Sequence, residues 1–195
     1  ANLLTKYRNS AVQTPASMFA SDRIFLEACV ELAAQGQMTC APNPPVGCII
    51  WRDGKVLGRG FHQRAGAGHA EVNALRSVEG GARNATVFVS LEPCSFVGRT
   101  PACARTLIDA GVARVVVAAV DPNPKVAGSG IRLLREAGIA VDVLELDSAK
   151  EQIQGFTQRI TRQRPWVRIK TATSLDGSVA VSYTHLTLPT SSQVV

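Results

Sequence analysis

The chain has 195 residues, of which 46% are hydrophobic and 18% are charged, and its formal net charge is +6. This length and balance suit one well-packed domain with an attached segment, and they exclude a disordered chain. No run approaches the roughly 18 consecutive apolar residues that a membrane-spanning helix needs, and residues 1–17 lack the apolar core of a signal peptide, so we expect a cytoplasmic protein.

The N-terminal half predicts a helix, a hairpin and a second short helix. Apolar residues at helical spacing form the first helix, with Ser21 as the expected N-cap and Gly36 as the stop. After a proline-rich loop, two β-type runs flank Asp53 and Gly54, which indicates a hairpin. The expected elements are a helix over 22–36, strands over 46–51 and 55–62, and a helix over 69–78.

The C-terminal half alternates strands and helices. The apolar run at 113–120 is typical of a strand that is covered on both faces. The alternation predicts a three-layer α/β/α sandwich on a mixed central sheet whose later strands are parallel. Expected strands cover 85–93, 113–120 and 139–146, and expected helices cover 102–111, 128–138 and 147–161.

The pattern changes near Pro165, where a run resembling the first strand of a new unit begins. We expect an N-terminal extension over 1–17, the main domain over 18–146, a helix and linker over 147–164, and a second unit over 165–195. After Ala180 the tail "VSYTHLTLPTSSQVV" does not complete that unit.

Positive charge is concentrated in residues 150–170, where six basic residues accompany a single acid. On a helix end and linker this composition favours a solvated face, and net charge alone does not establish a nucleic-acid partner. The six are Lys150, Arg159, Arg162, Arg164, Arg168 and Lys170.

Five cysteines are spread through the chain. Cys29 and Cys48 suit core packing, because free cysteine buries readily. Cys94 and Cys103 flank a loop with glycine and prolines, where a disulfide, a metal site and packing would each account for them. In a chain of this size and expected compartment, a close pair is more often metal-binding or catalytic than bridged.

His69 and Glu71 can serve one site only at the mouth of a helix, since positions i and i+2 of a regular helix face nearly opposite sides. Cys94 at a strand end and Cys103 at a helix entry could bring their sulfurs together near helix N-termini, which favour thiolates.

One histidine and two cysteines make the three protein ligands typical of catalytic zinc, which keeps a fourth position for water. Zinc can lower the pKa of that water to about 7, and Glu71 could carry its proton to a leaving amine. Each element alone occurs by chance or for structural reasons. Together, and followed by Pro-Cys, they indicate a zinc deaminase.

Several motifs resemble the deaminase domain of the bifunctional riboflavin-biosynthesis deaminase/reductase family, within the cytidine-deaminase-like superfamily. The matching stretches are "APNPPVGCII", "GFHQRAGAGHAEVNAL", "LEPCSFVGRTPAC", "AGVARVVVA", "DPNPKVAGSGI" and "LREAGI", and "RPWVRIKTATSLDG" resembles the start of that family's reductase domain. The likeness runs from about Met18 to Ala180. Nucleic-acid and nucleoside deaminases usually hold their two cysteines closer than Cys94 and Cys103.

The resemblance implies that residues 18–146 deaminate 2,5-diamino-6-(5-phosphoribosylamino)pyrimidin-4(3H)-one to the corresponding 5-aminouracil compound. It implies His69, Cys94 and Cys103 as zinc ligands and Glu71 as proton shuttle. The substrate would be a small molecule, with no nucleic acid or membrane involved, and a homo-oligomer is compatible with the family.

The resemblance also implies substrate contacts with chemistry suited to a phosphoribosyl-pyrimidine. Arg99 can meet a phosphate through charge-assisted bonds. For the residues beside prolines, turn formation is the alternative role, and His62 could equally be a structural histidine. The implied contacts are Asn43, His62, Arg99, Thr100, Asp121 and Asn123.

Two features depart from the family pattern. Phe96 stands where the family usually has a histidine; it could stack on a pyrimidine but cannot donate a hydrogen bond. The tail lacks the residues that would bind NADPH, so we expect no reductase activity. Alternatives are a zinc deaminase of another base, a nucleoside or tRNA adenosine, and an inactive fragment that binds a ligand.

Overall fold

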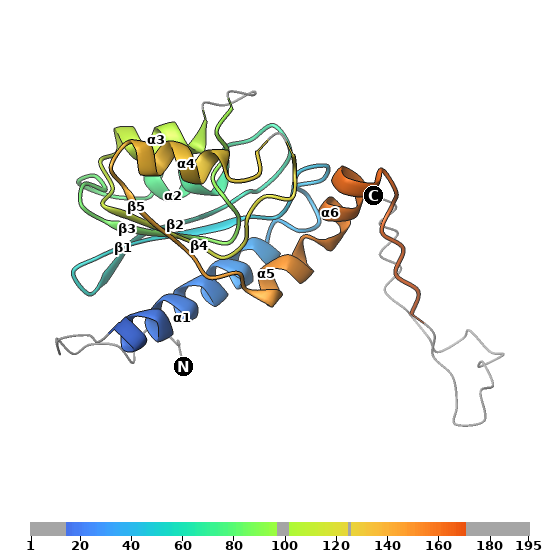
Figure 1. The fold of residues 1–195 in the computed structure, drawn as a ribbon, viewed down its shortest axis with the longest axis horizontal. Coiled ribbons are helices and arrows are strands. Elements are labelled where there is room, and N and C mark those ends of the chain that lie inside the picture. The colour runs from blue at the N-terminus through green and yellow to red at the C-terminus, as the bar shows by residue number, and fades with distance from the viewer. Residues whose placement is uncertain (1–14, 97–101, 125, 171–195) are drawn as a thin grey trace.

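The structure, a computed structural model, describes residues 15–96, 102–124 and 126–170 and contains a five-stranded sheet in the order β2-β1-β3-β4-β5 (Figure 1). Its strands are β1 (Gly47–Arg52), β2 (Lys55–Phe61), β3 (Thr86–Val89), β4 (Arg114–Val117) and β5 (Ala140–Val143). β1 is antiparallel to both β2 and β3, whereas β3, β4 and β5 run parallel. The prediction of a mixed sheet with parallel later strands is confirmed.

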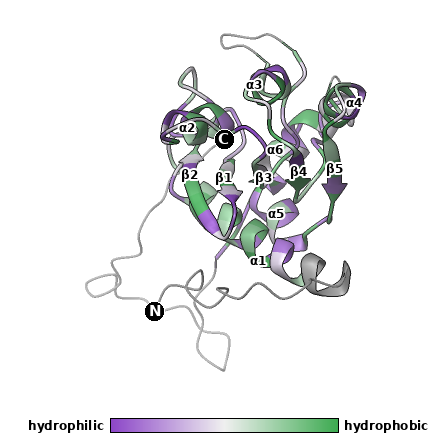
Figure 2. Ribbon diagram, turned by 90° about the vertical axis from the view of Figure 1, so that its left-hand side faces the viewer, coloured by the Kyte–Doolittle hydropathy of each residue, from purple (hydrophilic) through white to green (hydrophobic). Residues whose placement is uncertain are grey.

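Helices cover both faces of this sheet, which gives the expected three layers (Figure 2). They are α1 (Pro15–Ala34), α2 (Ala70–Arg76), α3 (Cys103–Asp109), α4 (Ser129–Glu136), α5 (Asp147–Gln152) and α6 (Gln154–Arg162). Helices α2, α3 and α4 lie on one face, and α1 and α5 lie on the other. Within the described ranges, every helix is too short or too polar to cross a lipid bilayer.

The side chains of the central strands alternate between two cores. In β3, Val87 and Val89 belong to the core beneath α2, α3 and α4, whereas Phe88 belongs to the core against α1. This period of two follows from strand geometry, and it explains why consecutive residues of β3 and β4 after their first position are apolar. Cys29 and Cys48 are fully buried in these cores, as the packing interpretation expected.

Three element boundaries differ from the sequence predictions. Helix α1 begins at Pro15 rather than after Ser21, because proline suits the first helical position and the following alanines and methionine favour a helix. The last predicted helix is divided at Ile153, which leaves helical geometry while its side chain is buried in the core. Strand β3 ends at Val89, where its paired register with β4 stops.

The hairpin prediction is confirmed. Asp53 and Gly54 both have positive φ angles, 51° and 78°, at the turn between β1 and β2. Positive φ at both central residues is the requirement of a type I′ turn, whose twist matches that of the flanking strands.

Two glycines in β2 allow α2 to lie directly on the strand. A Cβ atom at Gly60 would lie 2.3 Å from the nitrogen of Ala74 and 2.4 Å from the carbonyl oxygen of Ala70. A Cβ atom at Gly58 would lie 2.5 Å from the carbonyl oxygen of Ala74. The position of α2 relative to the sheet therefore depends on the absence of side chains here.

The buried carboxylate of Glu92 fixes the segment after β3 against the start of α4. Its Oε1 accepts the backbone N–H groups of Gly130 and Ile131 at 2.9 and 3.3 Å. Its Oε2 accepts those of Gly128 and Asp121 at 2.9 and 3.2 Å. Both carboxylate oxygens are thus used to hold backbone from a distant part of the chain.

Close backbone packing reinforces this junction. A Cβ atom at Gly130 would lie only 1.9 Å from the carbonyl oxygen of Pro93. The hydroxyl groups of Ser95 and Ser129 lie 2.6 Å apart. Residues 92–95 are therefore packed closely against the start of α4.

Gly60→Ala tests the contact between α2 and β2. We expect it to lower the free energy of unfolding by about 1–3 kcal/mol, since a methyl group would force two backbone segments apart. Gly155→Ala in α6 is the control: its Cβ meets nothing closer than 3.8 Å, and it should stabilise by up to about 1 kcal/mol through helix propensity. Urea unfolding measures both, and equal effects would contradict the close-packing argument.

Glu92→Gln tests the carboxylate junction. An amide keeps one acceptor oxygen and turns an NH₂ group toward backbone donors, so we expect a loss of about 2–4 kcal/mol, because each buried donor left unpaired costs about 1–3 kcal/mol. Glu136→Gln, at an exposed residue of the same α4 helix, should change stability little. A Glu92→Gln protein as stable as wild type in thermal or urea unfolding would show that the four bonds contribute nothing.

Candidate active site

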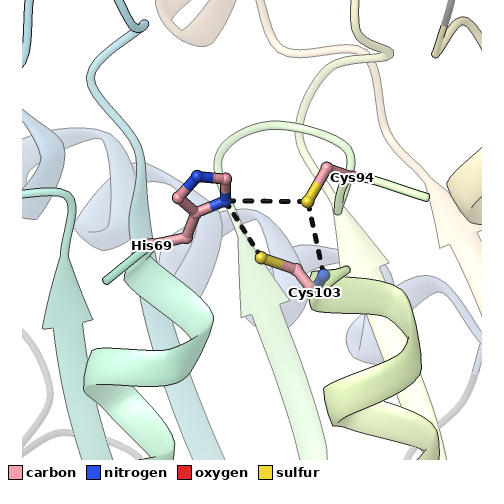
Figure 3. A group of neighbouring side chains, drawn as sticks. All are labelled: His69, Cys94 and Cys103. Carbon is pink, nitrogen blue, oxygen red and sulfur yellow. Dashed lines mark hydrogen bonds between the residues drawn. The ribbon is translucent and has the colours of Figure 1, made fainter. Parts of the chain in front are cut away.

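Three side chains from separate elements meet at one point (Figure 3). His69 is the N-cap of α2, Cys94 lies in the segment after β3, and Cys103 is the first residue of α3. The Nδ1 atom of His69 lies 3.1 Å from Sγ of Cys103 and 3.6 Å from Sγ of Cys94. All three possible ligand atoms lie within 4.8 Å of one another. The structure thus brings together the residues that the sequence predicts as ligands.

The local backbone explains why these atoms converge. His69 has extended backbone angles just before α2, so it is not in helical phase with Glu71. Cys103 donates its backbone N–H to Sγ of Cys94 at 3.3 Å, and Ala104 donates to the carbonyl oxygen of Cys94 at 3.1 Å. The start of α3 therefore closes back on Cys94, as the spacing of nine positions between the two cysteines required.

Both cysteines are free thiols rather than a disulfide. The hydrogen bond from Cys103 lowers the pKa of the Cys94 thiol well below its ordinary value, and the same contact raises the pKa of Cys103. The pKa of His69 is raised, chiefly by its hydrogen bond with Cys94. One imidazole nitrogen and two sulfurs are a donor set that suits zinc, and three protein ligands are the number found in catalytic zinc sites. These residues could hold that ion.

Glu71 lies beside this group, in the first turn of α2. Its side chain is 3% exposed, and burial raises the pKa of its carboxyl to about 7. The carboxyl is also hydrogen-bonded to Cys103. A carboxyl group with a pKa near neutrality can accept and return a proton at physiological pH.

A cavity of roughly 550 Å³ opens next to the convergent group, and His69, Glu71 and Cys94 form part of its wall. Four of the predicted substrate contacts also line it: Asn43, His62, Asp121 and Asn123. Phe96, which is 50% exposed, lines it as well. The other two predicted contacts, Arg99 and Thr100, lie outside the described residues.

His62 has both ring nitrogens engaged within the protein. Nδ1 donates to the carbonyl oxygen of Gly68 at 3.1 Å, and Nε2 therefore accepts from the side-chain amide of Asn43, also at 3.1 Å. Burial lowers the pKa of His62, which keeps the ring neutral. This geometry favours the structural alternative for His62, in which it orients Asn43 toward the cavity wall.

Asp121 and Asn123 form a turn beside the cavity. Oδ1 of Asp121 accepts the backbone N–H of Asn123 at 2.8 Å, so the expected turn chemistry is present. Burial raises the pKa of Asp121 to about 6. Glu92 accepts the backbone N–H of Asp121. Since Glu92 lies two residues before Cys94, this bond fixes the turn close to the Cys94 segment.

Helix α6 contributes residues that the sequence analysis missed. Phe156, Arg159 and Ile160 line the same cavity as His69 and Glu71. The prediction that the basic residues of 150–170 form a solvated face is wrong for Arg159, which is half-buried. The i, i+3, i+4 spacing of these three residues was the available signal, but it gave no indication of what the face would contact.

Comparison with known proteins shows which family the region around the three convergent side chains resembles. Residues 20–119 match the family described as the cytidine and deoxycytidylate deaminase zinc-binding region. The riboflavin biosynthesis protein RibD of Haemophilus influenzae is 46% identical over 164 residues, which cover 84% of this chain and 44% of that protein. The chain therefore spans less than half the length of the curated relatives it matches.

Solved structures share the fold as well as the sequence. RibD of Acinetobacter baumannii superposes with a TM-score of 0.78 at 45% identity, covering 84% of this chain and 46% of that one. A Thermotoga maritima diaminohydroxyphosphoribosylaminopyrimidine deaminase/5-amino-6-(5-phosphoribosylamino)uracil reductase gives 0.78 at 36% identity, covering 82% and 47%.

The region matched by the family contains all three convergent side chains and Glu71, and the folds of the relatives agree with the sandwich described above. The chain thus belongs to the cytidine and deoxycytidylate deaminase zinc-binding family, with RibD proteins among its relatives.

Proposed function

We propose that this chain is a zinc-dependent hydrolytic deaminase of riboflavin biosynthesis. Its substrate is 2,5-diamino-6-(5-phosphoribosylamino)pyrimidin-4(3H)-one, and its products are 5-amino-6-(5-phosphoribosylamino)uracil and ammonia. The observation that carries the proposal is the convergence of His69, Cys94 and Cys103 beside the buried Glu71 at a cavity. The likeness to RibD proteins supports the choice of substrate.

The proposal assigns the deaminase to residues 18–146 and the helix and linker to 147–164, with 1–17 as an N-terminal extension. Residues 165–195 belong to the second, reductase-like unit. NADPH would be a cofactor of a complete reductase domain only. The described part of that unit, up to Lys170, forms neither helix nor strand, and residues 171–195 lie outside the described residues.

In the proposed mechanism, His69, Cys94 and Cys103 would hold the metal, since an imidazole nitrogen and two sulfurs converge there. Bound zinc supplies a means of generating hydroxide near neutral pH. Glu71 takes the proton from the attacking water and returns it to the departing amino group. The substrate carbon gains a bond to oxygen, and its bond to nitrogen breaks with the electron pair leaving on ammonia. Water and substrate are the only reactants, so no redox partner is required.

The cavity supplies groups that suit the rest of this substrate. Phe96 is exposed enough to stack on a pyrimidine face. Asn43, oriented by His62, offers an amide for the base edge. Asp121 and Asn123 can bond ribose hydroxyl groups, while Arg99 and Thr100 are assigned to the phosphate end by the family resemblance alone.

Removal of any proposed ligand should abolish zinc binding. We expect wild-type protein to carry about one zinc ion per chain and His69→Ala, Cys94→Ala and Cys103→Ala to carry little, with parallel loss of ammonia release. Cys40→Ala removes a buried thiol that does not line the cavity, and it should keep its zinc. Elemental analysis decides the question, and a zinc-loaded Cys94→Ala, Cys103→Ala double variant would contradict the ligand assignment.

Glu71→Gln should retain zinc but release ammonia roughly 100- to 10,000-fold more slowly, the range typical of a lost general acid–base group. Glu79→Gln, at an exposed residue just beyond α2, is the matched control and should be as active as wild type. An active Glu71→Gln enzyme would disprove the proton-transfer role. Turnover of cytidine or guanine by a wild-type enzyme that ignores the ribotide would disprove the substrate.

A further inference from the structure

Helix α6 forms a wall of the cavity although it lies beyond the zinc-binding region at residues 20–119. Its residues Phe156, Arg159 and Ile160 share one helical face and line the cavity. Neither the metal group nor the proton-transfer mechanism uses them. They raise the question of which part of a substrate this wall would contact.

Arg159 has donors that the protein satisfies only in part. Its Nη2 donates to the carbonyl oxygen of Pro42 at 2.5 Å, and its guanidinium carbon lies 5.6 Å from the centre of the Phe156 ring. Its Nε is buried and has no hydrogen-bond partner in the part of the chain that the structure describes. A buried N–H without an acceptor is unfavourable, so a ligand that accepts this bond would remove the penalty.

The charge of Arg159 is also unmatched by the carboxylates around the cavity. Among the described residues, Arg159 takes part in none of the ion pairs. The carboxylates of the wall have other partners: Glu92 binds four backbone N–H groups, Glu71 is hydrogen-bonded to Cys103, and Asp121 binds Asn123. A guanidinium group at a cavity wall without a carboxylate partner favours an anionic ligand.

The position of Arg159 suits the end of a substrate that is remote from the reacting carbon. Pro42, which binds Arg159, precedes Asn43, whose amide lies 3.1 Å from His62. The rings of His62 and His69 are 5.3 Å apart. Pro42, Asn43 and His62 thus form a series of contacts that leads from Arg159 to His69. The phosphoribosyl substituent of the substrate would also extend away from the reacting carbon, so its phosphate end would lie on the Arg159 side of the cavity.

We propose that Arg159 binds the phosphate group of the substrate and so selects the phosphorylated pyrimidine over its dephosphorylated counterpart. This inference rests on the proposed function. The planar guanidinium can direct Nε–H and an Nη–H at two phosphate oxygens, while its remaining donors keep the bond to Pro42.

The test compares kcat and KM on the ribotide and on the same compound without its phosphate. Arg159→Ala should lower the ratio of the two kcat/KM values by about 10- to 100-fold, as loss of a charge-assisted hydrogen bond predicts, mainly through KM for the ribotide. Arg159→Lys should recover part of the ratio, because it keeps the charge but not the fork. Arg162→Ala removes an exposed charge from the same helix and should keep the wild-type ratio.

An equal loss on both substrates would overturn the inference, since it would mean that Arg159 only holds the loop at Pro42. If Arg159→Ala does not fold, as judged by circular dichroism, Arg159→Gln keeps the side-chain length without charge and gives the same comparison.

A wild-type enzyme that is inactive on the ribotide would count against the proposed function and leave Arg159 testable. Isothermal titration with ribose 5-phosphate and with ribose would then be compared in wild-type and Arg159→Ala proteins. Phosphate-dependent binding that disappears in the variant supports the anion subsite, and identical binding in both proteins overturns it.

Discussion

The contact of one imidazole nitrogen with two sulfurs constrains the rest of the fold, because the three atoms come from separate elements and lie within 4.8 Å. Glycines in β2 bring α2, and with it His69, down onto the sheet. Glu92 fixes the segment that carries Cys94, and the backbone bonds between that segment and the start of α3 place Cys103. A shift of about 1 Å at any of these junctions would separate the three atoms that are proposed to share one ion.

Two buried carboxylates near this point, Glu71 and Glu92, differ in their surroundings. Glu92 uses both oxygens to bind backbone N–H groups and therefore acts as a fixed structural acceptor. For Glu71, burial outweighs its hydrogen bonds with backbone and with Cys103 and raises its pKa to about 7. A group in this range can change its protonation state during a reaction at neutral pH. The same functional group is therefore a fixed structural acceptor in Glu92 and a group that titrates near neutral pH in Glu71, as the proposed proton transfer requires.

Sequence patterns predicted the features that depend on local chemistry. The hairpin follows from Asp53 and Gly54, and the alternation of buried strands and helices predicts the layers. The sequence was sufficient to predict that His69 at a helix start, Cys94 after a strand and Cys103 at the next helix start would come together. Contacts between distant segments were not predictable in this way: nothing near Glu92 indicates that it binds Gly130, and nothing near Arg159 indicates that it reaches Pro42. Such partners are determined by tertiary packing rather than by local pattern.

The wall of the cavity includes residues beyond residue 146, in helix α6. Helix α5 is attached to α1 by hydrogen bonds from Ser148 to Glu27 and from Gln152 to the carbonyl oxygen of Val30. Helix α6 then completes the cavity wall through Phe156 and Arg159. A chain cut at residue 146 would keep His69, Cys94, Cys103 and Glu71 but lose this wall. Under the proposed roles, the residues that react and the residue that selects the substrate lie in different stretches of the chain, so a change in α6 would alter specificity without touching a group that reacts.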